Sequence, residues 1–538
     1  MNRAKVIKSS RIFLHLSFIL GFILSLSNCN NAIVQEDMQS LKRKGFVDLN
    51  LDYSVTSSED SLVLILNGKK RVDNFECDEF NSSPTISFIS TTHIPNNDGK
   101  LHQSTWQTPV EINESFNYYF INLLSKKDSF FVPAINDFES ISNGYPVMFI
   151  YADEEDFFSD SSGIFVPGIN ADTNDIKKGG NYAMRGKEWE RKVYIQLFSP
   201  DARVVDQGWV GSRVHGNLSR AAPQKSIRFY ARPAYNKDQF NSLFNDSIPL
   251  SRFLIRTPFS SNWQLIYKDV LASEVAIEMG MDAMRFQPVI VYLNGEYWGY
   301  YNVRDRVDEY FFFNKYGIDS LDFVDLFSKV KYGSSHDYNK LNNWINKNDL
   351  REDENYTILQ SFIDIENYRR YLLLELFFAN KDWPHNNVRI WKSSELDNKW
   401  RWLIFDFDAT GRDSVDMYAH INNRVESGRN FWASNLMFGL LANENFFKQL
   451  LKDYNELAEG SLNVEYLQSK ADSLSSVYKP LLVDQINRWK FPESMEHFDE
   501  MHKNYLQFLV YRDQTIIKEL DKLHQLAIDY QNDHYNKE

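Results

Sequence analysis

Residues 364–380, DIENYRRYLLLELFFAN, limit the possible fold of this chain more than any other segment. From Tyr371 onward the segment is apolar nearly all round, and a helix with no polar face has to be buried on every side. Burial on every side needs a layered domain around the helix. The chain of 538 residues also exceeds what one hydrophobic core usually serves. The sequence therefore predicts two or three domains.

The first part of the chain shows the signals of β-strands. Short alternating runs at 61–66, 85–90 and 117–124 are separated by clusters of Asn, Asp, Gly and Pro, a pattern typical of a small β-sandwich. We expect this sandwich over residues 46–144, preceded by a polar tether over residues 29–45. The sandwich is expected to serve spacing or binding.

A second β-rich lobe is predicted between residues 146 and 304. Two strand-like runs flank Asn294-Gly295, and this dipeptide is the strongest short signal for a tight hairpin. One helix is expected inside the lobe at residues 268–280, because its apolar residues recur on one face and Gly280 suits a left-handed cap.

Helices are expected to dominate after residue 305. We predict three or four amphipathic helices between residues 434 and 523 and a polar, frayed tail over residues 526–538. The chain is therefore assigned to the α+β class. The β-sandwich comes first, and a two-lobed domain with a helical C-terminal lobe follows over residues 145–525.

The N-terminus carries the pattern of an export signal. Lysine or arginine at positions 5, 8 and 11 precedes an apolar run over residues 12–26, and Cys29 follows. The apolar run is too short for a comfortable membrane-spanning helix. We expect residues 1–28 to be a signal peptide and Cys29 to carry the lipid of a bacterial lipoprotein, anchored in the cell envelope on the periplasmic side or the surface. Simple secretion, with Cys29 incidental, is the alternative.

Cysteine content and charge narrow the class of protein further. Cys77 is the only other cysteine, so a mature lipoprotein has no internal disulfide and relies on its hydrophobic cores. The formal net charge of −14 argues against nucleic acid or an anionic membrane surface as the main partner.

One stretch departs from this acidic average. Residues 207–237 contain no Asp or Glu but six Lys or Arg. At the centre of the stretch, Gly216, Asn217 and Ser219 predict a tight turn with free backbone N–H groups, and Lys225 follows in a strand-like run. Close N–H donors followed by a cation on a rigid element suit the phosphates of a nucleotide. A solvated basic hairpin, or a patch for an anionic polymer, is the alternative.

Carboxylates and a carboxamide are grouped further along the chain. Asp382 follows the apolar helix, and Asn387 comes five residues later. Asp406 and Asp408 end an apolar run. Protein kinases use such a set, in which one Asp takes the acceptor proton while an Asn and a later Asp hold magnesium. The His-Arg pair before the first kinase Asp is absent here. Asp382 also fits a cap and Asn387 a turn, and Asn386 replaces Asn387 if the loop is shifted by one residue.

Together these motifs resemble a known family, the CotH-type (spore coat protein H) atypical kinases. Five blocks in the family's order carry the resemblance: NYAMRGKEWER at 181–191, the Gly-Asn-x-Ser-Arg and Pro-x-Lys-Ser motifs at 216–226, LNGEYWGYYNVRDRVDE at 293–309, DWPHNN at 382–387 and KWRWLIFDFD at 399–408. The resemblance covers about residues 145–525. It implies a protein-kinase-like fold, ATP with magnesium or manganese, and phosphoryl transfer to Ser or Thr. Gln224 and His215 depart from the family, where basic residues are common.

The kinase arrangement implies a role for each candidate residue. Asp382 and Lys225 are the catalytic candidates, and Lys225 is expected to meet Glu274, or Glu278, on the helix at 268–280. A solvated helix face is the alternative for both glutamates. The metal is assigned to Asn387, Asp406 and Asp408. The nucleotide is assigned to Gly216, Asn217, Ser219, Arg220, Lys225 and Glu274.

The leading hypothesis is phosphoryl transfer from ATP to a Ser or Thr hydroxyl on a protein by an envelope-anchored enzyme. ATP is scarce outside the cytoplasm, so the alternative is a non-catalytic scaffold lipoprotein, a pseudokinase, that recognises glycan or a protein partner. A metal-dependent hydrolase that uses Asp382 and Asp406 is a third hypothesis.

The N-terminal pattern leads to a direct prediction. Mass spectrometry of the protein isolated from its native membrane should find a mature chain that starts at Cys29 and carries acyl groups. A mature chain that starts at another residue and carries no lipid contradicts the assignment of Cys29.

Overall fold

In the computed structural model, the described residues are 51–58, 61–68, 76–79, 89–95, 102–108, 116–123, 128–135, 138–172, 174–175, 179–240, 243–244, 249–257, 265–411, 415–429 and 434–535. The predicted signal peptide, Cys29 and the tether lie outside them. Contacts divide the chain into two units, Met1–Asn136 and Asp137–Glu538, close to the boundary expected near residue 145.

The first unit contains two antiparallel sheets. One has the strand order β1-β2-β5-β4, with β1 at Leu51–Ser58, β2 at Ser61–Gly68, β5 at His102–Thr108 and β4 at Ile89–Pro95. The other has the order β3-β6-β7, with β3 at Glu76–Glu79, β6 at Phe116–Leu123 and β7 at Asp128–Ile135. The strands expected at 61–66 and 117–124 are thereby confirmed as β2 and β6.

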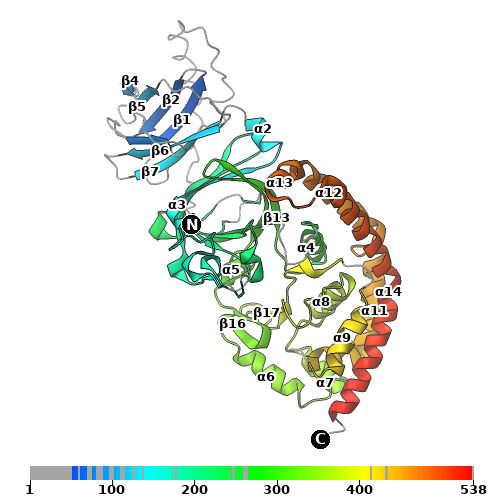
Figure 1. The fold of residues 1–538 in the computed structure, drawn as a ribbon. Coiled ribbons are helices and arrows are strands. Elements are labelled where there is room, and N and C mark those ends of the chain that lie inside the picture. The colour runs from blue at the N-terminus through cyan, green and yellow to red at the C-terminus, as the bar shows by residue number, and fades with distance from the viewer. Residues whose placement is uncertain are drawn as a thin grey trace, which may run out of the picture. The chain divides into compact units, whose positions relative to one another are not determined.

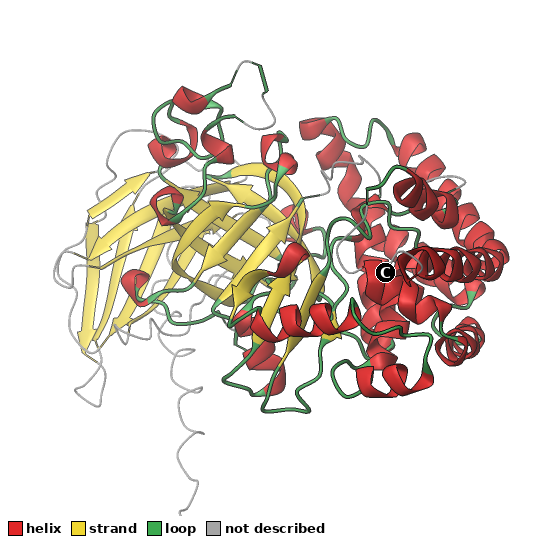
Figure 2. Ribbon diagram, turned by 90° about the horizontal axis from the view of Figure 1, so that it is seen from below, coloured by secondary structure: helices red, strands yellow, loops and turns green. Residues whose placement is uncertain are grey.

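The second unit opens with a closed seven-stranded barrel, whose strands are drawn in yellow in Figure 2. Its order is β10-β11-β12-β14-β13-β8-β9, and only β13 and β8 pair in parallel. The strands are β8 (Val147–Ala152), β9 (Arg191–Phe198), β10 (Val204–Val214), β11 (Ile227–Tyr230), β12 (Arg252–Arg256), β13 (Phe286–Leu293) and β14 (Glu296–Asp305). Two short helices, α2 (Phe138–Ser142) and α3 (Glu154–Phe158), flank β8.

Alternation along the strands sorts apolar and cationic side chains onto opposite faces of the barrel wall. Ile227 and Phe229 of β11 are fully buried in the barrel core together with Val214 of β10. Because successive side chains of a strand point to opposite faces, Arg228 of β11 and Arg213 of β10 lie on the outer face, where their Cα atoms are register partners. The acid-free stretch over residues 207–237 thus supplies both apolar side chains to the barrel core and arginines to the outer surface.

Two predicted local elements of this lobe are confirmed. The β13–β14 hairpin turns at Asn294 and Gly295, which both have positive φ (49° and 83°) as a two-residue turn of this kind requires. The Asn294 side chain also exchanges hydrogen bonds with the backbone of Ala152 at 2.8 and 2.9 Å. Helix α4 spans Lys268–Glu278, and Gly280 adopts the left-handed conformation (φ 76°) expected after its end.

A second, smaller sheet was not predicted. Its order is β16-β15-β17-β18, with β15 at Asp322–Asp325, β16 at Lys329–Tyr332, β17 at Arg389–Lys392 and β18 at Arg401–Trp402. The strands have four residues or two, which is too short for alternation to stand out in a sequence. Helix α5 (Glu309–Tyr316) precedes β15, and helices α6 (His336–Ile345) and α7 (Asp353–Leu359) are inserted between β16 and β17.

Helix α8 (Ile365–Phe377) is the buried helix that the sequence predicts. Seven of its residues from Tyr371 to Phe377 are buried, and α11 (Glu444–Ala458) and α14 (Met495–Tyr535) pack against it (Figure 1). The other helices of this half are α9 (Met417–Glu426), α10 (Ser434–Ala442), α12 (Val464–Tyr478) and α13 (Leu482–Trp489).

The C-terminal region corrects two expectations. Five helices, not three or four, lie between residues 434 and 535 in the described chain. The segment from 526 to 535 is the end of the 41-residue helix α14, not a frayed tail. Ala527 and Gln531 in it are buried, so tertiary packing holds these turns. Among the residues described, no helix combines the length and the apolar content needed to cross a membrane.

A closed set of hydrogen bonds joins the barrel to the helices. The buried Gln224 donates to the Tyr300 carbonyl at 3.1 Å, and Gln485 of α13 donates to Gln224 at 2.7 Å while it accepts from the Tyr300 N–H at 3.2 Å. Gly299 (φ 122°) leaves room for this arrangement, because a Cβ there would lie 2.5 Å from the Gln224 amide. Gln224 therefore connects the two halves of the unit.

Candidate functional site

The loop predicted to be catalytic is anchored directly to the buried helix. Asn380, which is fully buried, donates to the Glu375 carboxyl of α8 at 3.0 Å and accepts from the backbone N–H of Asp382 at 3.2 Å. The N–H of Lys381 donates to the carbonyl of Ala409 at 3.4 Å. Asp382 thus starts the loop from a rigid element and lies beside the segment that carries Asp406 and Asp408.

Asn387 and Asp406, two of the predicted metal ligands, are in contact. The Asn387 side-chain amide donates to the backbone carbonyl of Asp406 at 3.4 Å. Both residues have left-handed backbones, with φ of 59° and 64°. This conformation is uncommon outside glycine and clusters at functional sites. The structure therefore brings the Asp382 loop and the Asp406 segment together, as the sequence predicts.

Arg256, at the end of β12, binds the two carboxylates of this segment. Its Nη2 donates to Oδ1 of Asp406 and to Oδ2 of Asp408. A third carboxylate, Asp269 of α4, lies 3.7 Å from Arg256 Nη1 and 3.0 Å from Arg304 Nη2. Asp269 also accepts from the N–H of Phe407 at 2.9 Å. Barrel, helix α4 and the Asp406 segment thus meet in one ionic network.

Arg256 and Asp269 are not among the site residues predicted from the sequence. Arg256 ends an ordinary alternating strand, and Asp269 stands in the first turn of a helix, where acids are common. Their role follows from contacts with the FDFD segment, and these contacts join residues more than 130 positions apart in the chain. Local sequence patterns do not reveal such contacts.

The carboxylates are crowded and poorly solvated. Burial raises the pKa of Asp408 to about 6, and the neighbouring Asp406 and Asp269 act in the same direction while Arg256 opposes them. For Asp269 burial alone would raise the pKa, but Arg304 and Arg256 lower it below its ordinary value. The site therefore favours an added cation close to Asp408.

The donor atoms present fit a hard divalent cation. Asp406 and Asp408 offer carboxylate oxygens and Asn387 a carboxamide oxygen, the ligand types that magnesium and manganese prefer. Within the described part of the chain, no three His, Cys, Asp or Glu side chains form a preformed metal cluster. A metal here would rely on two carboxylates, the amide and groups from another ligand, as magnesium does in nucleotide sites.

The structure corrects the expected role of Lys225. Lys225 precedes β11 by two residues, and only 3% of it is exposed. Its Nζ donates to the carbonyls of Arg220 and Ala222 at 2.9 and 2.8 Å and lies 4.5 Å from the centre of the Tyr182 ring. Burial lowers its pKa to about 8. Lys225 is directed at the loop before it, where it holds carbonyl groups in place.

The expected ion pair between Lys225 and helix α4 is wrong. Glu274 lies 3.3 Å from Nζ of Lys470 on α12, and Glu278 lies 2.8 Å from the same atom. Both glutamates face the helical half of the unit, because α4 turns this side towards α12. Their contact with Lys470 joins the two helices and leaves the kinase-like pairing unformed.

The tight turn predicted at Gly216 is present. Gly216 has φ 112°, and a Cβ there would lie 2.2 Å from Oγ of Ser219. Asn217 accepts from Nη2 of Arg185 at 3.1 Å. Arg220 is turned inward and donates to four carbonyls, those of Gly216, Tyr182, Met184 and Val214. Arg220 and Lys225 thus stabilise the turn through hydrogen bonds on its buried side.

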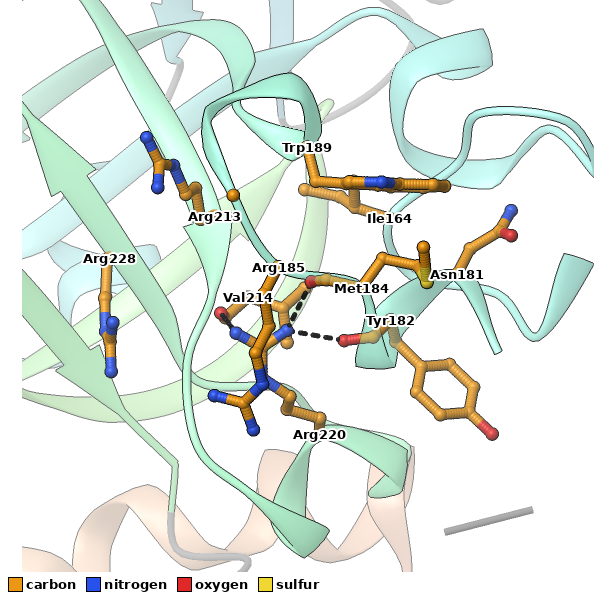
Figure 3. Close-up of a pocket in the computed structure, with 11 residues that line it drawn as sticks. Ile164, Asn181, Tyr182, Met184, Arg185, Trp189, Arg213, Val214, Arg220 and Arg228 are labelled. Carbon is orange, nitrogen blue, oxygen red and sulfur yellow. Dashed lines mark hydrogen bonds between the residues drawn. The ribbon is translucent and has the colours of Figure 1, made fainter. Parts of the chain in front are cut away.

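A cavity of about 210 Å³ lies beside this turn (Figure 3). Four arginines line it together with Trp189, and no described lining residue is acidic. Figure 3 shows Trp189 next to Ile164 on one side and the guanidinium groups of Arg213 and Arg228 on the other. The arginines are Arg185, Arg213, Arg220 and Arg228.

Arg228 differs from Arg213 in the partners that its guanidinium finds. Its Nε donates to Nδ1 of His215, and no described carboxylate forms an ion pair with it. Burial, together with the nearby Arg306, lowers its pKa to about 10. Burial and nearby arginines also lower the pKa of His215 well below its usual range, so this partner is neutral. Arg213, in contrast, is held by the buried Glu190 at 2.6 Å.

Residues 212–516, more than half of the chain, match the family model of the CotH kinase protein. The chain therefore belongs to the CotH kinase family, and the recognition made from the five sequence blocks is confirmed. The match includes the turn at Gly216, helix α4, the Asp382 loop and the Asp406 segment. No curated protein matches the chain.

Crowding at Asp408 leads to a prediction about pH. An acid whose pKa is raised on folding stabilises the folded state below its ordinary pKa of 3.8, and this contribution is lost as the pH rises to about 6. Above pH 6 the folded protein carries a buried charge that costs up to roughly 3 kcal/mol. In the absence of metal, Asp408→Asn should therefore raise the Tm relative to the parent by more at pH 7 than at pH 4.

The control for this measurement is Asp521→Asn, a change at an exposed position in the middle of α14. Its Tm difference from the parent should stay small at every pH, as is usual for surface changes. A Tm difference for Asp408→Asn that does not change between pH 4 and pH 7 contradicts the assignment of a raised pKa to Asp408.

Proposed function

We propose that this protein is a metal-dependent phosphotransferase that moves the γ-phosphoryl group of ATP to a Ser or Thr hydroxyl on a protein. One observation carries the proposal. The Asp382 loop, the contact between Asn387 and Asp406, and the outer arginine face of the barrel converge on one site. These are the groups that phosphoryl transfer needs: a residue that orients the acceptor, ligands for a metal and cations for phosphate.

The phosphates of the nucleotide would lie against the outer face of the barrel. Arg228 offers a half-buried guanidinium that pairs with no described acid, and Arg256, on the neighbouring strand β12, binds the carboxylates. Arginine binds phosphate through two parallel N–H donors, and burial strengthens the interaction. Arg228 and Arg256 therefore take the part that the sequence analysis assigned to Lys225, while Lys225 and Arg220 shape the loop at Gly216.

The ion would be held by Asp406, Asp408 and Asn387. When bound, magnesium or manganese neutralises charge on the β- and γ-phosphates and on the carboxylates. In the ligand-free protein, Arg256 provides this neutralisation, and an ion would compete with it for the same oxygens. Release of Arg256 from the carboxylates would leave its guanidinium available to a phosphate.

Asp382 would orient the acceptor hydroxyl and accept its proton. Its position on a loop fixed by Asn380 and Lys381 holds the carboxylate in a defined place. In this type of reaction, most of the rate enhancement comes from positioning and from charge stabilisation, with little demand for a strong base. A carboxylate of ordinary basicity is sufficient.

The proposal also assigns roles to the remaining parts of the chain. The barrel would act as the N-terminal lobe and helices α8 to α14 as the C-terminal lobe of a protein-kinase-like fold, with the two sheets of the first unit forming a β-sandwich. Export and a lipid on Cys29 would anchor the enzyme to the cell envelope. A non-catalytic scaffold is favoured by one observation, the inward-turned Lys225.

The variant Asp382→Asn separates the enzyme from the scaffold. The change keeps the size and capping capacity of the side chain but removes the charge that accepts the proton. Transfer from radiolabelled ATP to a degenerate Ser/Thr peptide pool should fall by about 10²–10⁴, the usual effect of losing a positioned base. ATP affinity should change little, because Asp382 lies on the acceptor side of the site.

Asp153→Asn is the matched control, since Asp153 is an exposed N-cap on α3 and its variant should keep parental transfer. If Asp382→Asn transfers phosphate at the parental rate, Asp382 has only a capping role. If the parent shows no transfer with any acceptor, the protein is a scaffold.

A further inference from the structure

The β15–β16 hairpin ends beside the candidate catalytic loop. Strand β17 starts at Arg389, directly after the loop over residues 382–388, and it runs antiparallel to β15 so that Asp325 lies opposite Arg389. The hairpin tip, residues 326–328, is therefore at the same end of the sheet as the loop. Arg389 joins the two regions, because it follows the loop directly and lies opposite Asp325 in the sheet. Its guanidinium lies 3.4 Å from the centre of the Phe405 ring, and Asp325 and Asp406 both stabilise its charge electrostatically.

The tip presents an aromatic side chain to solvent on a strained backbone. Phe327 and Ser328 have φ of 55° and 57°, a conformation that suits glycine and costs other residues roughly 1 kcal/mol or more. Phe327 is 74% exposed, more than any other described large apolar residue. Neither the strain nor the exposure helps folding, and such features persist where function requires them.

The outer edge of the hairpin is open for a further strand. In the described sheet β16 is an edge strand, and all four of its residues are exposed. A bulge shifts the register, so that Tyr332 lies opposite Phe323 and Val330 lies opposite Val324, and the two side chains fall on opposite faces of the hairpin. The Tyr332 ring packs at 5.5 Å from that of Phe313, which extends one apolar face onto α5.

Charge also distinguishes the two lysines of β16. Lys331 is paired with Asp325 at 2.6 Å, whereas Lys329, next to the tip, forms no ion pair with any described residue. Lysine on an edge strand discourages pairing between identical edges, because two copies would bring like charges together. A segment that carries a carboxylate meets no such repulsion, so the edge favours an acidic partner over a second copy of this chain.

We propose that this hairpin, residues 322–332, is the docking surface for the acceptor protein. An extended segment of the acceptor pairs with the free edge of β16, places an apolar side chain against Phe327, and offers a carboxylate to Lys329. Strand addition of this kind uses backbone hydrogen bonds for affinity and side-chain contacts for selection. The inference rests on the proposed phosphotransferase function and names its substrate class: extended Ser/Thr segments with a neighbouring apolar residue and an acid.

The test compares peptide pools that contain one Ser, with each flanking position fixed in turn as Leu, Asp, Lys or Gly. The parent should phosphorylate pools with Leu and Asp near the Ser most efficiently. Phe327→Ala should raise the KM for the Leu pool at least tenfold and abolish the Leu preference, while ATP hydrolysis without peptide stays at the parental rate. Lys329→Glu should reverse the preference from Asp to Lys.

Two further variants exclude a folding effect. Phe327→Gly removes the side chain and the backbone strain together, so its Tm should rise while its use of the Leu pool falls as in Phe327→Ala. Ile169→Ala truncates a side chain that is 71% exposed in a loop of the barrel lobe and should leave peptide use unchanged.

Unchanged peptide preference in Phe327→Ala and Lys329→Glu overturns the docking surface even if the parent is an active kinase. Equal loss of ATP hydrolysis and peptide transfer in Phe327→Ala, with a lowered Tm, also overturns it, because the tip is then structural. A parent with neither hydrolysis nor transfer removes the phosphotransferase function and the inference with it.

Discussion

The contact of Arg256 with Asp406 and Asp408 is the interaction on which the rest of the site depends. Three carboxylates, including Asp269, converge in a poorly solvated place, and without a cation their repulsion would push the Asp406 segment away from the barrel. Arg256 comes from the barrel, Asp269 from α4 and Asp406 from the segment after the small sheet. One guanidinium therefore joins the barrel to the half of the unit that carries the Asp382 loop, and in the proposed function it marks where a nucleotide and an ion would meet.

Charge is distributed unevenly around this contact. On the helical side, burial and neighbouring acids raise the pKa of Asp408 to about 6, and on the barrel side, burial and neighbouring arginines lower the pKa of Arg228 to about 10. A bound ATP molecule with its metal would bring a cation to the carboxylates and phosphate anions to the arginines, and so would balance the charge on both sides. Lys225 and Arg220 donate to backbone carbonyls, so they position the turn at Gly216, and in the proposed function the phosphates would meet the outer arginines instead.

Local patterns predicted the local parts of this structure. The buried helix α8, the Asn294-Gly295 hairpin and α4 with its Gly280 end all depend on neighbouring residues. The proximity of Asn387 to Asp406 was also predicted. The partners of Lys225 and Glu274 and the role of Arg256 were not, because a charge has many possible partners and only the tertiary fold selects one. Strands as short as β16 and β18 carry too few residues to show a period.

Calorimetric titration of ATP into the full-length protein, with magnesium and with a chelator, tests the central claim most directly. The account predicts that the parent binds ATP tightly only with magnesium, since Asp406, Asp408 and Asn387 act on the nucleotide through the ion. Asp406→Asn should lower the affinity for magnesium-ATP at least tenfold. Equal affinity with and without magnesium, or an unchanged affinity in Asp406→Asn, would contradict the claim that this carboxylate site holds the metal of the nucleotide.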